Sequence, residues 1–433
     1  MMPTPMQHNK VQQPWLRWLA GTAGLLVMLA LLVAWLNVRG EMPLDANGPN
    51  TAAPDPLTVE RGAYLARTGN CMGCHSTAGA QAYAGGLRME TPFGTVVTPN
   101  ITPDPATGIG SWSAAAFWRA MHHGRSQDGR LLYPAFPYPS YTLVTREDSD
   151  ALYAYLRTVK PVVQANKPHA LTFPYNTQAA LAVWRALFFR PGTLTPEPQQ
   201  TAEWNRGRYL VDGLAHCAAC HSSRNALGAT GLNAEFAGGL MPDASWYAPS
   251  LASPDEAGLQ NWSRAEAVHL LKNGVARDAT VSGPMAEVVY NSTQHLTEPD
   301  LNAMVAYLAS IPVRDNSKSE VPRAYANVLG RGAKIYEQQC VACHGDQGQG
   351  VASIYPALAG NRAVLLDSPN NLVQTIRKGG FSPSTAGNPQ PFGMPPFAQV
   401  LNNDDIAAVA TFVRQSWGNA APAVSALDVH RVK

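Results

Sequence analysis

Cys71-Met72-Gly73-Cys74-His75 is the first of three Cys-x-x-Cys-His pentapeptides in this chain of 433 residues. The other two are Cys217-Ala218-Ala219-Cys220-His221 and Cys340-Val341-Ala342-Cys343-His344. This spacing is the attachment signal for c-type haem. Two cysteines three positions apart on a helical turn face the same way, so both can form thioethers with the haem vinyl groups. The histidine that follows them then lies under the iron as its proximal ligand.

The three pentapeptides contain all six cysteines of the chain. No cysteine therefore remains for an all-cysteine zinc site elsewhere, and disulfide frameworks are typical of much shorter secreted chains. The sequence predicts three covalently bound haem c groups. The predicted attachment residues are Cys71, Cys74, Cys217, Cys220, Cys340 and Cys343, and the predicted proximal iron ligands are His75, His221 and His344.

Each pentapeptide lies in a segment that repeats one order of signals. An arginine-glycine pair marks the predicted start of an opening helix; the pairs are Arg61-Gly62, Arg206-Gly207 and Arg331-Gly332. Apolar residues at spacings of three and four then predict a middle and a closing helix. The middle helices are Ser113–His123, Ser263–Asn273 and Asn370–Lys378, and the closing helices are Thr145–Val159, Thr297–Ser310 and Asn403–Trp417. Thr145, Thr297 and Asn403 suit N-cap positions.

The repeat predicts a mainly α-helical protein, with three tandem class I cytochrome c-like domains after one N-terminal transmembrane helix. We expect the domains at residues 59–165, 203–312 and 326–418. The other predicted parts are residues 1–58 with the anchor at 18–36 and a tether, linkers at 166–202 and 313–325, and a tail at 419–433. The first linker contains the apolar run Val183–Phe189 and is expected to pack rather than to hang free.

Trp18–Leu36 is an uncharged run of 19 residues. At ~1.5 Å per residue it can cross a hydrocarbon core of ~30 Å. Lys10 and Arg17 precede the run, whereas Arg39 and Glu41 follow it, so the positive excess predicts a cytoplasmic N-terminus. A cleaved signal peptide is the alternative, but its apolar core would be only ~7–15 residues and no Ala-x-Ala site follows. We expect a single-pass inner-membrane protein with its haem domains in the periplasm.

Two methionines are candidates for the sixth iron ligand. Met285 lies in Ser282–Ala286, 64 residues after His221, and Met394 lies in Pro391–Pro396, 50 residues after His344. Both come before the closing helix of their segment, among prolines and glycines. Axial methionine raises the reduction potential of a haem relative to bis-histidine ligation. Most methionines are core residues, and this is the alternative for both.

The first segment departs from this pattern. Phe136 stands where the methionine would be, 61 residues after His75, and phenylalanine cannot bind iron. Nearby candidates are Met121, His122 and His123 at the end of the middle helix, and Met89 further upstream. The two histidines could equally be surface residues favoured by the helix dipole. A five-coordinate first haem also remains open.

Composition excludes other classes. The net charge is +2 and the pI is about 8.2, which is not the balance of a nucleic-acid binder. Charged residues make up 14% of the chain and hydrophobic residues 45%, so the chain can bury ordinary cores and is not a charged disordered protein. No phosphate-binding glycine-rich loop and no Gly-x-Ser-x-Gly motif stands out.

Beyond the haem motifs, the chain resembles one family from about residue 60 to residue 417. It is the membrane-bound triheme cytochrome c subunit of bacterial periplasmic quinone-reducing dehydrogenases. The residues that carry the resemblance are Pro92–Thr95, Asn100–Asp104, Gly108–Gly110, Leu132–Tyr138, Glu203–Gly207, His216–His221 and Trp246–Pro249.

The resemblance implies an electron-transfer subunit whose large catalytic partner oxidises the substrate. In such complexes the partner is an alcohol dehydrogenase with pyrroloquinoline quinone, a flavin-dependent sugar or sugar-acid dehydrogenase, or a molybdopterin hydroxylase with a small iron–sulfur subunit. Ubiquinone is the usual acceptor. Alcohol-dehydrogenase relatives typically have methionine where Phe136 stands, so Phe136, with Leu187–Gly192, is more similar to the molybdenum-linked branch. Whether the chain itself is an enzyme stays open, because substrate chemistry is expected on the partner.

Two alternative functions come from other classes. A peroxidase-type haem enzyme would use an open first haem with an acid–base residue beside it. A cytochrome c subunit of a respiratory oxidase would usually bring copper ligands or further transmembrane helices, and the sequence has one such helix.

Overall fold

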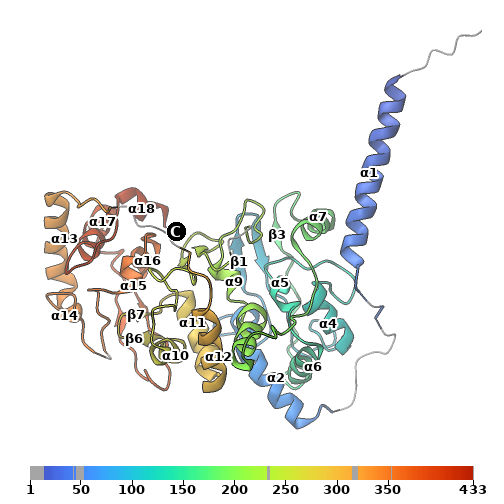
Figure 1. Ribbon diagram of the computed structural model, residues 1–433, viewed down its shortest axis with the longest axis horizontal. Helices are drawn as coiled ribbons and strands as arrows, with labels where there is room; N and C mark the ends of the chain where they lie inside the picture. The colour runs from blue at the N-terminus through green and yellow to red at the C-terminus, as the bar shows by residue number, and fades with distance from the viewer. Residues whose placement is uncertain are drawn as a thin grey trace, which may run out of the picture.

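Three hydrophobic clusters form the body of the protein. The structure, a computed structural model of the chain, describes residues 14–41, 43–44, 53–231, 235–314, 320–352 and 354–432. One cluster includes Leu65, Phe117 and Leu152, the next includes Leu210 and Leu301, and the last is built around Val373 and Ile406 of the C-terminal part. We call the surrounding segments, residues 56–188, 202–309 and 326–431, the first, second and third units. Figure 1 shows them in a row, with the second in the middle.

The N-terminal helix α1 (Pro14–Val38) stands apart from the three units in Figure 1. Among the described residues, it is the only helix long and apolar enough to cross a membrane, over Arg17–Val38. Its last turn is fixed to the first unit. The Asn37 amide donates to the carbonyl of Ala182 at 2.9 Å, and Arg185 Nε donates to Asn37 Oδ1 at 2.8 Å. Arg125 and Glu41 form a largely buried ion pair at 2.9 Å. The segment after the anchor, predicted to be a tether, is therefore held against the body at its beginning.

The first unit is helical with one small sheet. Its elements are α2 (Pro56–Thr68), α3 (Cys71–His75), β1 (Arg88–Thr91), β2 (Gly94–Val97), α4 (Ala114–His123), α5 (Tyr138–Tyr141), α6 (Arg146–Leu156), β3 (Ala170–Leu171) and α7 (Gln178–Phe188). The strands form an antiparallel sheet in the order β1-β2-β3. The segment 166–202, predicted to be a linker that packs, contributes β3 and α7, and α7 packs against α1.

The second unit has the same opening, middle and closing helices. Its elements are α8 (Ala202–Arg208), the π-helix η1 (Tyr209–Leu214), α9 (Ala218–His221), β4 (Gly239–Leu240), β5 (Tyr247–Ala248), α10 (Arg264–Asn273), β6 (Val275–Ala276), β7 (Ala279–Thr280), α11 (Pro284–Asn291), the 3-10 turn η2 (Thr293–His295) and α12 (Glu298–Ala309). The π-helix accommodates the extra residue that this unit has between its arginine-glycine pair and its first cysteine, compared with the first unit.

The third unit extends beyond its predicted end. Its elements are α13 (Ala326–Gln339), α14 (Val341–His344), α15 (Arg362–Leu365), α16 (Asn370–Lys378), β8 (Gly380–Phe381), β9 (Gly393–Met394), α17 (Asn403–Arg414) and α18 (Ala426–Arg431). Residues 419–433 were predicted to be a tail. Instead, α18 packs on α17, because Val424, Val429 and Val432 are buried in the same cluster as Ile406.

The arginine-glycine pairs lie inside the opening helices rather than at their starts, which come four or five residues earlier. The glycines allow a close helix crossing. A Cβ added at Gly62 would overlap the carbonyl oxygen of Ala151 on α6, and Gly332 has the same relation to Ala408 on α17. Gly207 repeats this contact with α12. In every unit the opening helix therefore crosses the closing helix at backbone contact, which any larger residue would prevent.

The arginines fix the same crossing by charge. Arg61 pairs with Asp148 at 2.6 Å, and Arg206 pairs with Asp300 at 2.8 Å. Arg331 repeats the pair in the third unit, with Asp405 at 2.7 Å. Each aspartate lies in the first turn of its closing helix, whose N-caps are Thr145, Thr297 and Asn402. The prediction of Asn403 as the third cap was wrong by one residue, because the Asn402 side chain accepts the hydrogen bond from Asp405 N.

The first two units exchange hydrogen bonds through these same aspartates. Tyr64 of the first unit donates to Asp300 of the second, and Tyr209 of the second donates to Asp148 of the first, both at 2.6 Å. The two contacts are equivalent under exchange of the units. The third unit has Lys334 at the matching position, so this reciprocal contact belongs to the first two units.

The glycine crossing leads to a prediction with a matched control in one helix. Gly332→Ala should lower the free energy of unfolding by about 1–3 kcal/mol, because its methyl group overlaps α17. Gly330→Ala, with nothing within 4 Å of the added Cβ, should be neutral or stabilising by about 0.4–1 kcal/mol. Thermal unfolding of the full chain, followed by circular dichroism, measures both. Equal melting temperatures for the two variants would contradict the crossing.

Candidate haem sites

The pentapeptides begin just after the opening helices. The first lies on α3, while α9 and α14 hold the later residues of the other two, with Cys217 and Cys340 at their N-caps. The turns before the first two are tight: Asn70 and His216 have left-handed backbones, with φ of 47° and 42°. In each unit the pentapeptide comes directly or within a few residues after the opening helix. The helix crossing therefore also sets the position of the pentapeptide.

Each pentapeptide histidine makes the same hydrogen bond. Its Nδ1 lies 2.7 to 3.0 Å from the carbonyl oxygen of a proline; the pairs are His75–Pro99, His221–Pro249 and His344–Pro356. A carbonyl oxygen only accepts, so Nδ1 carries the proton and Nε2 presents its lone pair. Burial lowers the pKa of all three histidines, which favours the neutral, metal-binding form. Metal-bound histidines generally donate their second ring nitrogen in this way.

Cys71, Cys217 and Cys340 do not have the lowered pKa of a reactive redox pair. All six are free thiols here and half-buried. Burial raises the pKa of Cys71 and Cys217 to about 12 and that of Cys340 to about 11, whereas reactive dithiols have lowered values. Within the described part of the chain, no group of three His, Cys, Asp or Glu side chains could hold a metal ion. This arrangement does not fit a zinc site.

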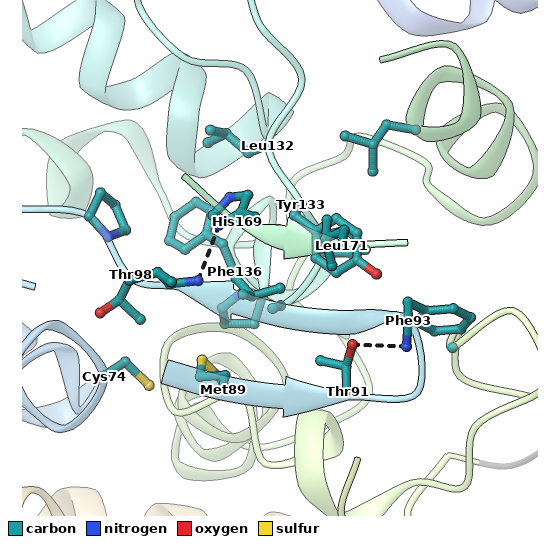
Figure 2. Close-up of a pocket in the computed structure, with 18 of the residues that line it drawn as sticks. Cys74, Met89, Thr91, Phe93, Thr98, Leu132, Tyr133, Phe136, His169 and Leu171 are labelled. Carbon is teal, nitrogen blue, oxygen red and sulfur yellow. Dashed lines mark hydrogen bonds between the residues drawn. The ribbon is translucent and has the colours of Figure 1, made fainter. Parts of the chain in front are cut away.

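One large cavity, of about 3020 Å³, opens beside the first pentapeptide. Cys71, Cys74 and His75 line one part of it, together with apolar residues such as Leu152 and Phe117. Figure 2 shows the region around Cys74, next to the strands of the small sheet. A space with two thiols, a free imidazole Nε2 and apolar walls fits a haem, whose macrocycle needs apolar contact on both faces.

The first two pentapeptides lie close together. Cys220 of the second lines the same cavity as Cys74 of the first. Burial raises the pKa of Cys74, and the nearby thiol of Cys220 raises it further. In addition, α11 of the second unit contacts α3 of the first. The reciprocal tyrosine contacts thus bring two candidate haem sites next to each other.

The two candidate methionines both lie after the middle helix of their unit. Met285 is half-buried in the first turn of α11, rather than in an extended loop. Gly283 before it has a left-handed backbone and packs on Trp246. Met394 is in β9, paired with Gly380, and packs on the third cluster, as Cys340 also does. The structure thus brings Met394 into contact with the core that also surrounds the third pentapeptide.

The candidates for the first unit fall into two groups. Phe136, Met121 and Met89 line the cavity with Cys74. Two histidines that follow Met121 contribute nothing to its walls: His122 stacks on Trp118 with ring centroids 4.3 Å apart, and the His123 carbonyl accepts from Arg185. Both histidines are buried, which differs from the alternative that they are surface residues.

The internal repeat distinguishes the two methionines that remain as candidates for the sixth ligand of the first haem, Met121 and Met89. Each middle helix ends at a glycine with positive φ, Gly124, Gly274 or Gly379. Counted from these glycines, Met121 corresponds to Leu271 and Ile376, which pack in the cores of their units and cannot bind iron. Met121 is itself 5% exposed and part of the first core. Its position is that of a core residue.

Met89 has a different setting. Its neighbours on β1, Arg88 and Glu90, are exposed and pair with each other at 3.7 Å. Alternation along the strand turns the half-buried Met89 to the opposite face. All three residues line the cavity, and Met89 brings a thioether to it (Figure 2). A thioether on a flexible side chain is a suitable soft ligand for haem iron.

Sequence reasoning missed the proline carbonyls and the tyrosines between units. The prolines follow their histidines by 24, 28 and 12 residues, a spacing without period. The one available signal was the tyrosine three residues after Arg61 and Arg206, replaced by lysine after Arg331.

Comparison with known proteins agrees with this geometry. The model of the family "Cytochrome c" matches residues 59–160, 205–312 and 329–417, so each matched range contains one pentapeptide. The cytochrome c subunit of the quinone alcohol dehydrogenase from Gluconacetobacter polyoxogenes is 40% identical over 401 residues, covering 88% of this chain and 86% of that subunit. The cytochrome c subunit of gluconate 2-dehydrogenase from Pantoea cypripedii is 39% identical, with 86% and 88% covered.

A third relative is longer than this chain. It is one of the subunits of nicotinate dehydrogenase from Pseudomonas putida, and it is 37% identical over 97% of this chain, which spans 35% of that relative. The family model matches a range in each unit, and the relatives match most of the chain, so both comparisons identify the family. The chain therefore belongs to the cytochrome c family, among the cytochrome c subunits of quinone-linked dehydrogenases.

Proposed function

We propose that the chain carries three haem c groups and passes electrons from a catalytic dehydrogenase subunit, which oxidises an alcohol or aldehyde, to ubiquinone. The observation that carries the proposal is the threefold repetition of one constellation: two thiols, a histidine, and a proline carbonyl on its Nδ1. Neither alternative, a peroxidase or a respiratory oxidase subunit, is favoured by the names of the relatives.

The haems supply the one-electron chemistry, and the chain supplies their setting. The six cysteines would hold them covalently, and His75, His221 and His344 would bind iron through Nε2. Met285 and Met394 are the proposed sixth ligands in the second and third units. Three class I cytochrome c domains, at about 59–165, 203–312 and 326–418 with α18 packed on the last, are the proposed organisation.

We infer that α1 crosses the inner membrane once, with the three units in the periplasm. Arg17 lies before the apolar run, and the fixed Arg125–Glu41 pair follows it on the side of the body. Lys10, the other positive residue of the prediction, lies outside the described residues. The hydrogen bonds between Asn37, Ala182 and Arg185 support this end of α1 as the point where the helix leaves the bilayer, because a guanidinium such as that of Arg185 is costly among lipid chains.

The partner is the direct test of this function. Purification from membranes in mild detergent should yield the chain with a large catalytic subunit containing pyrroloquinoline quinone or molybdopterin, and with an iron–sulfur subunit in the molybdopterin case. Adding the substrate of that subunit should reduce the haems, as followed by their absorption. A chain that purifies alone, or haems that the substrate leaves oxidised, would contradict the proposal.

For the first haem we propose Met89 as the sixth ligand. Met89→Leu keeps the volume but removes the sulfur, so it should lower the potential of one haem by on the order of 0.1 V, within the ~0.8 V that axial ligands span. The same haem should then bind carbon monoxide when reduced. The measurements are a redox titration followed by absorption, and a carbon monoxide difference spectrum.

Met121→Leu is the matched control, because the repeat has leucine or isoleucine at that position. This variant should keep all three potentials. If Met121→Leu instead shifts one haem and Met89→Leu shifts none, the two assignments must be exchanged. A wild-type chain that already binds carbon monoxide at one haem would mean an open first site and would favour the peroxidase alternative.

A further inference from the structure

Helix α7 presents an uncharged outer face beside the membrane helix. Arg185 is its only charged residue and is buried, donating to the end of α1. Val183 and Leu187 are 48% and 57% exposed. Figure 1 shows α7 beside the end of α1 that adjoins the body. An apolar surface at this place meets the boundary of the bilayer, provided that α1 crosses it.

The large cavity reaches this face. Val183, Trp184 and Leu187 line it on the α7 side, and Cys74 and His75 line it on the other. Trp184 Nε1 donates to the carbonyl of Leu227 at 2.9 Å, which fixes the indole at the rim. The space next to the first pentapeptide is therefore continuous with an apolar surface near the predicted membrane.

A polar ring, His169, lies within this mainly apolar passage, whose lining also includes charged residues such as Arg130 and Lys167. His169 lines the cavity just before β3, and its Nδ1 accepts from Val97 N–H at 3.1 Å. The neutral ring therefore carries its proton on Nε2, which can donate to a ligand. The Tyr133 ring lies 6.4 Å from that of His169, and Figure 2 shows both above the small sheet. A mainly apolar passage that offers a ring donor matches a lipophilic ligand that carries a carbonyl oxygen.

We propose that the cavity between α7 and β3 binds the head group of a membrane quinone, with His169 Nε2 donating to one quinone oxygen. The proposal rests on the proposed function, because it takes quinone as the electron acceptor. The tail of the quinone would leave the cavity past Val183 and Leu187 and enter the bilayer. The first haem is then the one that faces the quinone.

The reaction balances with these groups. Each quinone takes two electrons, which the dehydrogenase partner provides and the first haem delivers singly. Each quinone oxygen also gains one proton. His169 Nε2–H donates a hydrogen bond to one quinone oxygen and keeps its proton, because a neutral ring whose Nδ1 accepts from Val97 N–H would otherwise become an imidazolate. Both protons come from water.

The matched variants are two exposed valines of the first unit. Val183→Glu introduces a carboxylate at the mouth of the cavity, whereas Val163→Glu introduces one at a residue that is 82% exposed and outside the cavity lining. The haem-loaded complex in detergent is reduced with dithionite, freed of excess reductant, and mixed with decylubiquinone. Haem reoxidation is followed by absorption. Val183→Glu should slow it about tenfold or more, as expected for a charge in an apolar passage, while Val163→Glu keeps the wild-type rate.

Photolabelling of the wild-type complex with an azido-ubiquinone gives a second measurement, independent of electron transfer. The label should appear in peptides covering residues 169–187, and His169→Phe should weaken quinone binding. Labelling elsewhere, or equal reoxidation rates for both valine variants, would overturn the site but leave quinone as acceptor. Absence of labelling because a catalytic subunit covers α7 would also overturn it and assign this face to that partner. If decylubiquinone does not reoxidise the wild-type haems while ferricyanide does, the quinone part of the proposed function fails as well.

Discussion

The backbone contact between a glycine of the opening helix and a carbonyl of the closing helix is the constraint on which each unit depends. Gly62, Gly207 and Gly332 let the two helices touch, and the arginine before each glycine binds an aspartate at the start of the closing helix. Each pentapeptide comes shortly after the end of the opening helix. The crossing therefore also sets the direction in which two thiols and an imidazole point. A proline carbonyl then fixes each imidazole with Nε2 free. The same helix crossing thus holds each unit together and positions the side chains that would bind its haem.

The same aspartates also connect the first two units. Tyr64 and Tyr209 each reach across to the aspartate of the other unit, and the cavity that holds Cys74 extends to Cys220. The first unit is in turn clamped to the end of α1 through Asn37. In the proposed function, electrons that enter at the third or second unit would arrive at the first unit, near the proposed membrane surface and its lipophilic acceptor. The third unit contacts the second through Arg362, which donates to the carbonyl of Pro254 at 2.7 Å, and it completes the row.

Local patterns predicted much of this. The pentapeptides, the middle helices and the caps Thr145 and Thr297 follow from short-range chemistry, and the structure has them where the spacing predicts. Long-range contacts could not be predicted in the same way. The valines that bury α18 have no strong period, and the proline partners of the histidines have no fixed spacing. The role of the arginine-glycine pairs appears only when the closing helix lies against them. For the first iron, the internal repeat identified Met121 as core, which the sequence alone left open.

The haem count of the mature chain tests the central claim most directly. Thioether bonds survive denaturation, so unfolded chain treated with alkaline pyridine keeps covalently bound haem and loses any other. Absorption of this haemochrome against protein concentration should give about three haems per chain, one for each Cys-x-x-Cys-His pentapeptide. Two or fewer in fully matured protein would contradict the account, because at least one unit would then hold the constellation of thiols, imidazole and proline carbonyl without its cofactor.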